Sequence, residues 1–327
     1  MTITLNSLLE TAQVISLPLK QKFRGVTHRE MLIFEGENGF AEWSPFLEYE
    51  AEEAAVWLRA AVEWAFGDLP QPQREYVEVN ATLPAVAPQN VASSLEPFGA
   101  FETVKIKVAE PGQDLNADLE RIWQVRRLHP NAKLRLDANG GWSVEQAVAI
   151  AGAMVENGVQ LDYLEQPCAT IAELAELRVI LKRNSFLVKV AADESVRKVT
   201  DPQAVVMAGA ADVLVLKAAP LGGVTRAMQI AAESGLACAV SSALESSVGL
   251  AMGLHLAACL PDFGLAAGLG TAALLAADVT ENPLLPVGGE LVVRRVHPSP
   301  RLLADHAASP ERRAWWLDRL AAAHALL

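Results

Sequence analysis

Three acidic residues, each at the end of a short apolar run, stand at a constant step of 28 residues: Asp137, Glu165 and Asp193. Acidic residues are poor strand formers, so their placement at matching strand ends points to chemistry. In a parallel barrel the carboxyl ends of all strands meet at one end, where barrel enzymes place their active sites. Three carboxylates at one point repel one another unless a hard divalent cation accepts their oxygens. The spacing therefore predicts a metal site, with Mg²⁺ as the expected ion and Mn²⁺ as its substitute.

Three lysines accompany these carboxylates. Lys105 and Lys107 are two residues apart on one strand-like run, so both side chains point to the same side, the barrel interior. Like-charge repulsion and partial burial are expected to depress the pKa of each. Lys217 ends a later run and is expected across the barrel mouth. A metal between opposed lysines suits removal of a proton next to a carboxylate, with the metal holding the enediolate and one lysine taking the proton. A single lysine of this kind commonly caps the surface or pairs with an acid, so the prediction depends on the whole set.

The elements that must position these residues alternate in type along the chain. Helices are predicted at 143–157, 170–183, 223–234 and 246–259, the first two opening with capping-box spacing. Strand-like runs, eight in all, lie between such helical segments at 76–82, 103–108, 133–138, 161–166, 187–193, 212–217, 237–242 and 263–268. Alternation of this kind is typical of an α/β fold with a parallel sheet, and eight strands favour a (β/α)₈ TIM barrel over residues 76–284.

Residues 1–75 show a different pattern. Strands are predicted near 10–17 and 30–44, followed by an amphipathic helix near 50–66. This segment is expected to form an α+β capping domain. The C-terminal segment 285–327 lies beyond the barrel strands and contains a Gly-initiated strand, GGELVVRRVHP, which is expected to return to that first lobe.

The composition of the chain disfavours some classes of binding partner. The chain of 327 residues carries a net charge of −12 and no basic stripe, which disfavours nucleic acid. Its apolar stretches are too short for membrane insertion, and its N-terminus lacks the features of a signal peptide. The unpatterned cysteines Cys168, Cys238 and Cys259 fit a reducing cytoplasm. A cytoplasmic enzyme is expected, and the oligomeric state is left open.

Several motifs resemble one family. VKIKV, RLDANGGW, LEQP, ADES and DVLVLK are similar to the enolase superfamily, in the branch of muconate lactonizing enzyme. The resemblance implies an enolase-like barrel, either (β/α)₈ or the modified (β/α)₇β form, with an N-terminal capping domain. It also implies a lysine base working with magnesium. Lys107 would be that base, Lys105 would tune its pKa, and Lys217 would face the other side of the substrate. Asn139 and Glu194 would orient the metal ligands, for which plain local hydrogen bonding is an equal alternative.

The loops at the last strands decide the branch. SSALESS (241–247) lacks the histidine of the mandelate racemase type, and AAGLGTA (266–272) lacks the Asp-x-Asp of dipeptide epimerases. Both loops resemble the o-succinylbenzoate synthase family. Small residues with exposed backbone N–H groups can receive an anionic carboxylate substrate, and ordinary loop structure is the competing explanation. The candidate substrate contacts are Ser241, Ser242, Gly268, Gly270 and Thr271, with Arg24 from the capping domain. Trp43 and Phe46 are expected either to exclude water or, more simply, to pack in the core.

The resemblance implies a lyase of the hydro-lyase (dehydratase) class. Its expected reaction is the Mg²⁺-dependent conversion of 2-succinyl-6-hydroxy-2,4-cyclohexadiene-1-carboxylate to 2-succinylbenzoate, a step of menaquinone biosynthesis. The alternatives on the same scaffold are an N-succinylamino acid racemase, with Lys107 and Lys217 as opposed bases, and a muconate-type cycloisomerase. An alternative of another class is a catalytically silent structural or binding protein. The intact set of lysines and carboxylates argues against that last alternative.

Overall fold

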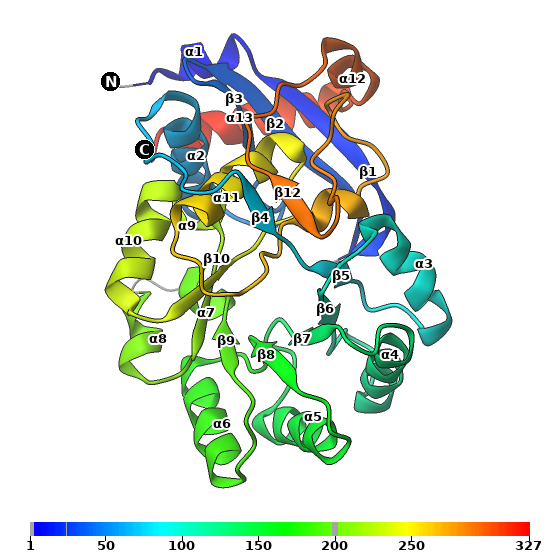
Figure 1. The fold of residues 1–327 in the computed structure, drawn as a ribbon. Coiled ribbons are helices and arrows are strands. Elements are labelled where there is room, and N and C mark those ends of the chain that lie inside the picture. Colours follow the sequence, from blue (N-terminus) through cyan, green and yellow to red (C-terminus); the bar gives the residue numbers. More distant parts are fainter. Residues whose placement is uncertain (1–2, 24, 198–201) are drawn as a thin grey trace.

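Parallel strands alternating with helices build the larger of two lobes, the lower one in Figure 1. The structure is a computed structural model that describes residues 3–23, 25–197 and 202–327. Within this described part, seven strands form one parallel sheet in the order β11-β10-β9-β8-β7-β6-β5. These are β5 (Ala81–Leu83), β6 (Thr103–Lys107), β7 (Lys133–Asp137), β8 (Leu161–Glu165), β9 (Val190–Ala192), β10 (Val213–Leu216) and β11 (Ala237–Val240).

The barrel is closed by residues 266–268 rather than by a full eighth strand. Ala267 and Gly268 make isolated parallel bridges to Val79 and Ser241, and the Gly268 N–H donates to the Val240 carbonyl at 2.8 Å. The strand expected at 263–268 is therefore shortened to these bridges, since glycines weaken strand pairing. A 3₁₀ helix, η3 (Gly270–Leu274), follows instead of an α-helix. The architecture is the modified (β/α)₇β barrel.

Helices cover the outside of this sheet (Figure 1). The capping boxes predicted at Ser143 and Thr170 are both formed, with Gln146 and Glu173 as the reciprocal partners. The helices after the successive strands are α3 (Val91–Leu95, flanked by the 3₁₀ helices η1, Pro88–Asn90, and η2, Glu96–Phe98), α4 (Leu115–Leu128), α5 (Val144–Glu156), α6 (Ile171–Arg183), α7 (Glu194–Arg197), α8 (Gln203–Met207), α9 (Ala218–Leu221), α10 (Val224–Ser234) and α11 (Ser247–Cys259). The four long helices predicted from the sequence are confirmed to within one residue at each end.

The run expected as one strand at 76–82 is divided. Its first part, β4 (Tyr76–Glu78), pairs antiparallel with β12 (Glu290–Val292), and only its second part, β5, joins the barrel sheet. The division falls at Asn80, whose N–H donates to the Ala267 carbonyl of the closing segment at 2.9 Å. The Gly-initiated strand after residue 285 thus pairs with β4 and not, as expected, with the sheet of the first lobe.

The smaller, upper lobe contains a three-stranded antiparallel sheet of β1 (Gln13–Phe23), β2 (Val26–Gly36) and β3 (Gly39–Trp43), with helices α1 (Leu5–Leu9) and α2 (Ala51–Phe66). The C-terminal helices α12 (Pro300–Asp305) and α13 (Pro310–His324) lie against it. The Ser16 N–H donates to the His306 carbonyl at 2.9 Å, and the Ala308 N–H donates to the Val14 carbonyl at 2.9 Å. The end of the chain therefore completes the capping lobe.

Trp43 and Phe46 are core residues of this lobe. Trp43 is fully buried, meets the Trp316 ring edge-on at 5.4 Å between centroids, and donates its indole N–H to the Ala54 carbonyl. The Phe46 ring packs edge-on against Trp57. Packing, rather than exclusion of water from a site, explains both residues.

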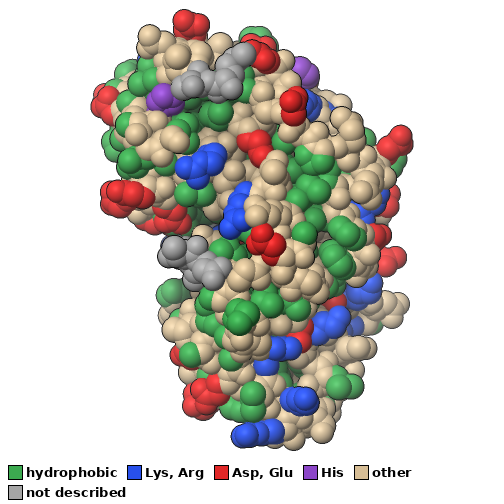
Figure 2. Space-filling model, turned by 90° about the vertical axis from the view of Figure 1, so that its left-hand side faces the viewer, with side chains coloured by type: hydrophobic (Ala, Val, Ile, Leu, Met, Phe, Trp, Pro, Cys, Tyr) green, Lys and Arg blue, Asp and Glu red, His purple; other side chains and the backbone are tan. Residues whose placement is uncertain are grey.

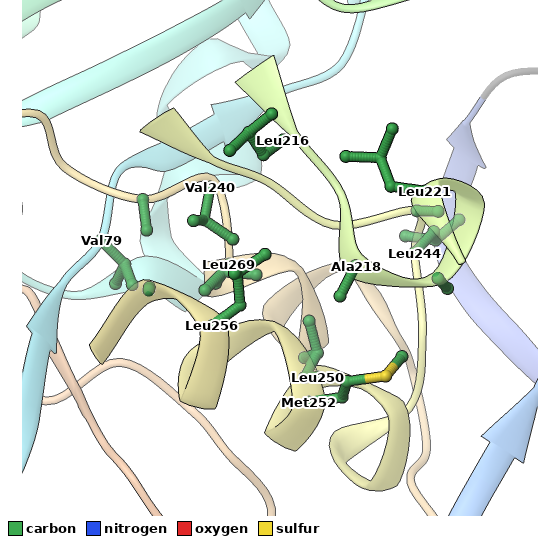
Figure 3. Close-up of a cluster of buried hydrophobic side chains, with 14 of the residues drawn as sticks. Val79, Leu216, Ala218, Leu221, Val240, Leu244, Leu250, Met252, Leu256 and Leu269 are labelled. Carbon is green, nitrogen blue, oxygen red and sulfur yellow. The ribbon is translucent and has the colours of Figure 1, made fainter. Parts of the chain in front are cut away.

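Helix α11 joins the two lobes. Its sequence, SVGLAMGLHLAAC, has almost no polar face, which is the pattern of a helix buried on all sides. Figure 3 shows Leu250, Met252 and Leu256 of this helix below Val240 and Leu216 of the barrel strands. On its other side the helix contacts β3 of the capping lobe. The start of α11 is therefore held between barrel and cap.

Charges of both signs are mixed on the surface seen in Figure 2, where Lys and Arg side chains are interspersed with Asp and Glu. Across residues 3–23, 25–197 and 202–327, no helix combines the length and the apolar character needed to cross a bilayer.

Candidate metal and catalytic site

Strand register brings the key side chains to one end of the barrel. Lys107 of β6 pairs with Asp137 of β7, and Asp137 pairs with Glu165 of β8. Glu165 in turn pairs with Ala191 of β9, two residues before Asp193. Side chains two residues apart on a strand share a face, so Asp193 lies on the same side as Glu165. All three carboxylates are almost completely buried.

Each carboxylate is paired with a lysine. Lys107 Nζ lies 2.5 Å from Asp137 Oδ2, and Lys217 Nζ lies 2.6 Å from Asp193 Oδ2. Lys105 Nζ lies 2.9 Å from Glu165 Oε1 and 3.5 Å from Asp137 Oδ2. The buried negative charges are thus neutralised by buried ammonium groups, as burial of unpaired charge would be very costly.

The carboxylates respond differently to this environment. Burial raises the pKa of Glu165 to about 7, and the neighbouring Asp137 charge adds to the rise. Burial also acts to raise the pKa of Asp137 and of Asp193. For Asp137 the charges of Lys107 and Lys105 outweigh it, and for Asp193 those of Lys217 and Arg197 do, so both pKa values lie below their ordinary range. Lys105 Nζ lies within 3.5 Å of both Asp137 and Glu165, so these two carboxylates are close to each other.

The two lysines of β6 differ, which corrects the expectation that each would depress the other. Burial lowers the pKa of Lys107, and the charge of Lys105 lowers it further, against the opposing effect of Asp137. Burial acts in the same direction on Lys105, but Glu165 and Asp137 outweigh it and raise its pKa above the ordinary value. Only Lys107 is therefore shifted toward the neutral amine that a general base requires.

The donor set fits a divalent cation. Buried carboxylate oxygens from three adjacent strands are the hard ligands that Mg²⁺ and similar ions prefer. In the described part of the chain, no three His, Cys, Asp or Glu side chains are drawn together closely enough to hold an ion as they stand. The lysine ammonium groups are in contact with the carboxylates instead. Metal binding would exchange these ammonium contacts for metal contacts.

Asn139 and Glu194 lie beside the carboxylates. Asn139 Oδ1 accepts from Lys107 Nζ at 2.8 Å, and its backbone N–H donates to Asp137 Oδ1 at 3.2 Å. The Asn139 amide donates to Glu194 Oε1 at 3.3 Å. Asn139 has a positive φ of 46°, a conformation that asparagine tolerates better than most residues. These bonds set the position of Lys107 relative to Asp137.

Two further residues position Asp193 and were missed in the sequence. Arg197 lies 3.2 Å from Asp193 Oδ1 and 2.8 Å from Glu194 Oε1, and it donates to the Tyr49 hydroxyl of the capping lobe at 3.1 Å. Its position four residues after Asp193, on one helical face, is a signal that could have found it. Gln166 Oε1 accepts from the backbone N–H groups of Asp193 and Ser195. Its signal was only its adjacency to Glu165.

A small cavity of about 30 Å³ lies against the lysines. The predicted residues Ser241, Ser242, Gly268 and Thr271 line it, together with Lys105, Lys107, Asp137, Lys217, Phe23, Thr82, Ala243 and Leu244. Phe23 and Thr82 were not anticipated. A Cβ on Gly268 would stand 2.6 Å from Ser241 Oγ and 3.2 Å from Ser241 Cβ, so a larger residue would force Ser241 to shift.

Two predicted contacts are not among these lining residues. Gly270 faces the other way, since a Cβ there would meet the Asn80 carbonyl at 3.1 Å and Pro286 at 3.2 Å. Its place is in the packing beneath the cavity. Arg24 lies outside the described residues.

Comparison with known families matches both lobes. Residues 89–298 match the family described as enolase C-terminal domain-like, and residues 14–65 match the enolase N-terminal domain-like family.

Individual relatives are similar over nearly the full chain. An o-succinylbenzoate synthase of Mycobacterium ulcerans (strain Agy99) is 50% identical over 324 residues, 99% of this chain and 96% of the relative. An o-succinylbenzoate synthase of Mycobacterium tuberculosis (strain ATCC 25618 / H37Rv) is 49% identical over 323 residues, with the same coverage.

Solved structures share the fold at low identity. A muconate lactonizing enzyme of Pseudomonas fluorescens complexed with muconolactone superposes with a TM-score of 0.76 at 18% identity, covering 91% of this chain and 98% of that one. The L-Ala-D/L-Glu epimerase of Bacillus subtilis, in a substrate-liganded complex, gives 0.72 at 24% identity, covering 88% and 96%.

Proposed function

Because this chain belongs to the enolase superfamily, we propose that it is a lyase that dehydrates 2-succinyl-6-hydroxy-2,4-cyclohexadiene-1-carboxylate to 2-succinylbenzoate, a step of menaquinone biosynthesis. The observation that carries the proposal is the convergence of Lys107, Lys217 and the carboxylate Asp137 on one cavity. Such a site can perform several reactions. Relatives at 49–50% identity are named o-succinylbenzoate synthase, which favours this activity over the others.

Asp137, Glu165 and Asp193 would hold the divalent cation, Mg²⁺ in our proposal with Mn²⁺ as a substitute. When bound, the ion supplies positive charge against which a substrate carboxylate binds and becomes more acidic at its alpha carbon. The shared burial of the three ligands keeps water from weakening that charge. Asn139, Glu194, Arg197 and Gln166 hold the ligands in place.

Lys107 would remove the proton alpha to the carboxylate. Its lowered pKa makes the neutral amine accessible, and Asn139 directs its Nζ. The leaving hydroxyl takes up the proton and departs as water. One C–H and one C–O bond break, a ring double bond forms, and the product is aromatic.

Lys217 would act as a fixed positive charge on another side of the cavity. Its ammonium lines the cavity, where it would stabilise the negative charge that develops when the proton leaves. Lys105, whose pKa is raised, stays charged and keeps the pKa of Lys107 low. Ser241, Ser242, Gly268 and Thr271 would receive the succinyl carboxylate from the opposite loops.

A second activity is favoured by one observation. Lys107 and Lys217 both line the cavity, but they come from β6 and from the end of β10. An N-succinylamino acid racemase needs two bases on two sides of one carbon. Incubation with an N-succinylamino acid in D₂O tests this: rapid deuterium uptake at the alpha carbon would favour the racemase.

The dehydration is tested by following absorbance of the cyclohexadiene substrate with Mg²⁺ and after removal of metal with EDTA. Lys107→Ala should lower kcat by about 10²–10⁴-fold, while Lys133→Ala, at the exposed start of β7, is the matched control and should leave kcat unchanged. Full activity in EDTA, or in Lys107→Ala, would contradict the proposal.

We also infer a cytoplasmic location. Cys168, Cys238 and Cys259 are all buried and free of disulfides, the usual state of thiols in a reducing compartment.

A further inference from the structure

A buried carboxylate links the capping lobe to the loop that lines the cavity. Glu42 lies on β3 and is 4% exposed. One of its oxygens accepts from the Ser246 backbone N–H at 3.0 Å and from the Ser246 hydroxyl at 2.5 Å. The other oxygen accepts from the Ser44 hydroxyl at 2.7 Å. Ser246 is the N-cap of α11, so a side chain of one lobe fixes the start of the helix that the other lobe contributes.

The residues just before Ser246 line the cavity. Ser241, Ser242, Ala243 and Leu244 all face it, and Leu244 also lies near Leu221 of α9 (Figure 3). On the strand side the barrel holds this loop, since Ser241 and Ser242 donate their N–H groups to Leu216 and Gly268 carbonyls. At its other end, where α11 begins, Glu42 of the capping lobe holds the loop through Ser246. The loop is therefore hydrogen-bonded to the barrel at one end and to the capping lobe at the other.

The loop also has one hydrogen bond within itself and one from Arg29 of the capping lobe. Glu245 Oε2 accepts from the Ala243 N–H at 2.7 Å. Arg29 of β2 donates to the Ala243 carbonyl at 3.4 Å and to the Ser44 carbonyl. Arg29 is thus a second connection, beside Glu42, between the capping lobe and this loop.

Placing Glu42 beside Glu245 costs stability. Both carboxylates are buried, and each buried charge loses its hydration. Room for both is made by Gly249, one turn into α11, where a Cβ would stand 2.7 Å from Glu245 Cβ and 2.9 Å from Glu42 Cδ. Glycine inside a helix is itself unfavourable by roughly 1 kcal/mol. An apolar contact would join the two lobes without the free-energy cost of burying a carboxylate. We therefore expect Glu42 to have a role beyond holding the lobes together.

We propose that Glu42 is a positioning residue for substrate binding: through Ser246 it fixes the cavity-lining loop 241–246 to the capping lobe. This inference rests on the function proposed above, because the loop is the expected contact for the succinyl carboxylate. Glu42 is not among the residues that line the cavity, and its side-chain partners Ser246 and Ser44 are neither the lysines nor the expected metal ligands. Its loss should therefore weaken substrate binding more than it slows turnover.

The test compares three variants by steady-state kinetics. Glu42→Ala removes all three hydrogen bonds and should raise KM roughly 10-fold with kcat within about 2-fold of the wild type. Glu42→Gln is the conservative variant: its carbonyl can accept both Ser246 donors, and its amide can donate to the Ser44 hydroxyl, so KM should return close to the wild-type value. Glu30→Gln is the matched control, because Glu30 is held by Arg312 and Trp316 within the same lobe. It should lower stability and leave KM unchanged.

Hydrogen–deuterium exchange of the free protein supplies a readout that needs no substrate. Amides of residues 241–247 should exchange faster in Glu42→Ala than in the wild type, and at wild-type rates in Glu30→Gln. If Glu42→Ala does not fold, Ser246→Ala removes one of the three bonds, together with the cap bond from the Val248 N–H, and should give a change in the same direction. An unchanged KM and unchanged loop exchange in the folded variant would overturn the proposal, as would an equal KM rise in Glu30→Gln. A wild type without dehydratase activity would refute the proposed function instead, and the exchange result would still decide the role of Glu42 in holding the loop.

Discussion

Replacing Glu42 by glutamine should remove a pH dependence of stability from the folded protein. Burial raises the pKa of Glu42 to about 7, and the nearby Glu245 charge adds to the rise, while Ser246, Ser44 and Arg29 act against it. Burial likewise raises the pKa of Glu245, on which Arg29 and Lys217 act in the opposite direction. In the unfolded chain Glu42 should titrate near its ordinary value of 4.5.

The sign follows from these two values. A carboxyl whose pKa is raised by folding binds its proton more tightly in the folded state. Its contribution to stability is fully present below pH 4.5 and is lost as the pH rises through about 7. The difference between the folded and unfolded pKa values of Glu42 corresponds to about 3 kcal/mol, most of which is lost between pH 5 and pH 8. For a chain of this length that is a change of roughly 4 °C in Tm.

The assay is thermal unfolding of the wild type and of Glu42→Gln across pH 5 to 8. Glutamine cannot titrate, so the comparison removes the titration of Glu42 together with its repulsion of Glu245. The Tm of the variant relative to the wild type should rise by roughly 4 °C from pH 5 to pH 8. A difference in Tm that stays constant over this range would refute the reasoning, and so would a difference that falls.

Three other predictions concern the site and the scaffold. Lys107→Ala should lower kcat by about 10²–10⁴-fold with an unchanged circular dichroism spectrum; turnover within a few fold of the wild type would exclude Lys107 as the base. Glu165→Gln removes one of three expected carboxylate ligands. Mg²⁺ at about 100 times the wild-type Kd adds about 2.7 kcal/mol to the stability of the wild type. The same concentration should raise the Tm of the variant far less than it raises the Tm of the wild type. An equal rise in both proteins would show that Glu165 does not bind the ion. Thr170→Ala removes a capping box with Glu173 and should cost about 1 kcal/mol in urea unfolding while kcat and KM stay unchanged.

The helices and most strands of the barrel could be predicted because their signals are local. The capping boxes at Ser143 and Thr170 are read within four residues, and apolar periodicity defines the helices that follow. Local sequence patterns gave a wrong strand boundary where the pairing of a strand depends on segments far away in the chain. The run 76–82 looks like one strand, but its two halves pair with β12 and with β6. Nothing within that run specifies a partner more than 200 residues away.

The environment of each charged group could not be predicted for the same reason. Lys105 and Lys107 are equivalent in the sequence, but Lys105 meets Glu165 and Asp137 and its pKa rises, whereas burial dominates at Lys107 and its pKa falls. Glu42 gave no strong sequence signal, since its partner Ser246 is remote along the chain. Gly270 belongs to the same loop as Gly268 and Thr271, but it faces the packing on the other side.

The sequence by itself determined which residues stand at the ends of the barrel strands. The length of one strand–helix unit sets the 28-residue step of Asp137, Glu165 and Asp193, and the two-residue alternation of a strand sets the common side of Lys105 and Lys107. Tertiary structure alone decided which ammonium meets which carboxylate, how residues 266–268 close the barrel, and how the capping lobe holds loop 241–246. Periodicity is a property of neighbouring residues. Burial and pairing depend on the three-dimensional packing of segments that are far apart in the chain.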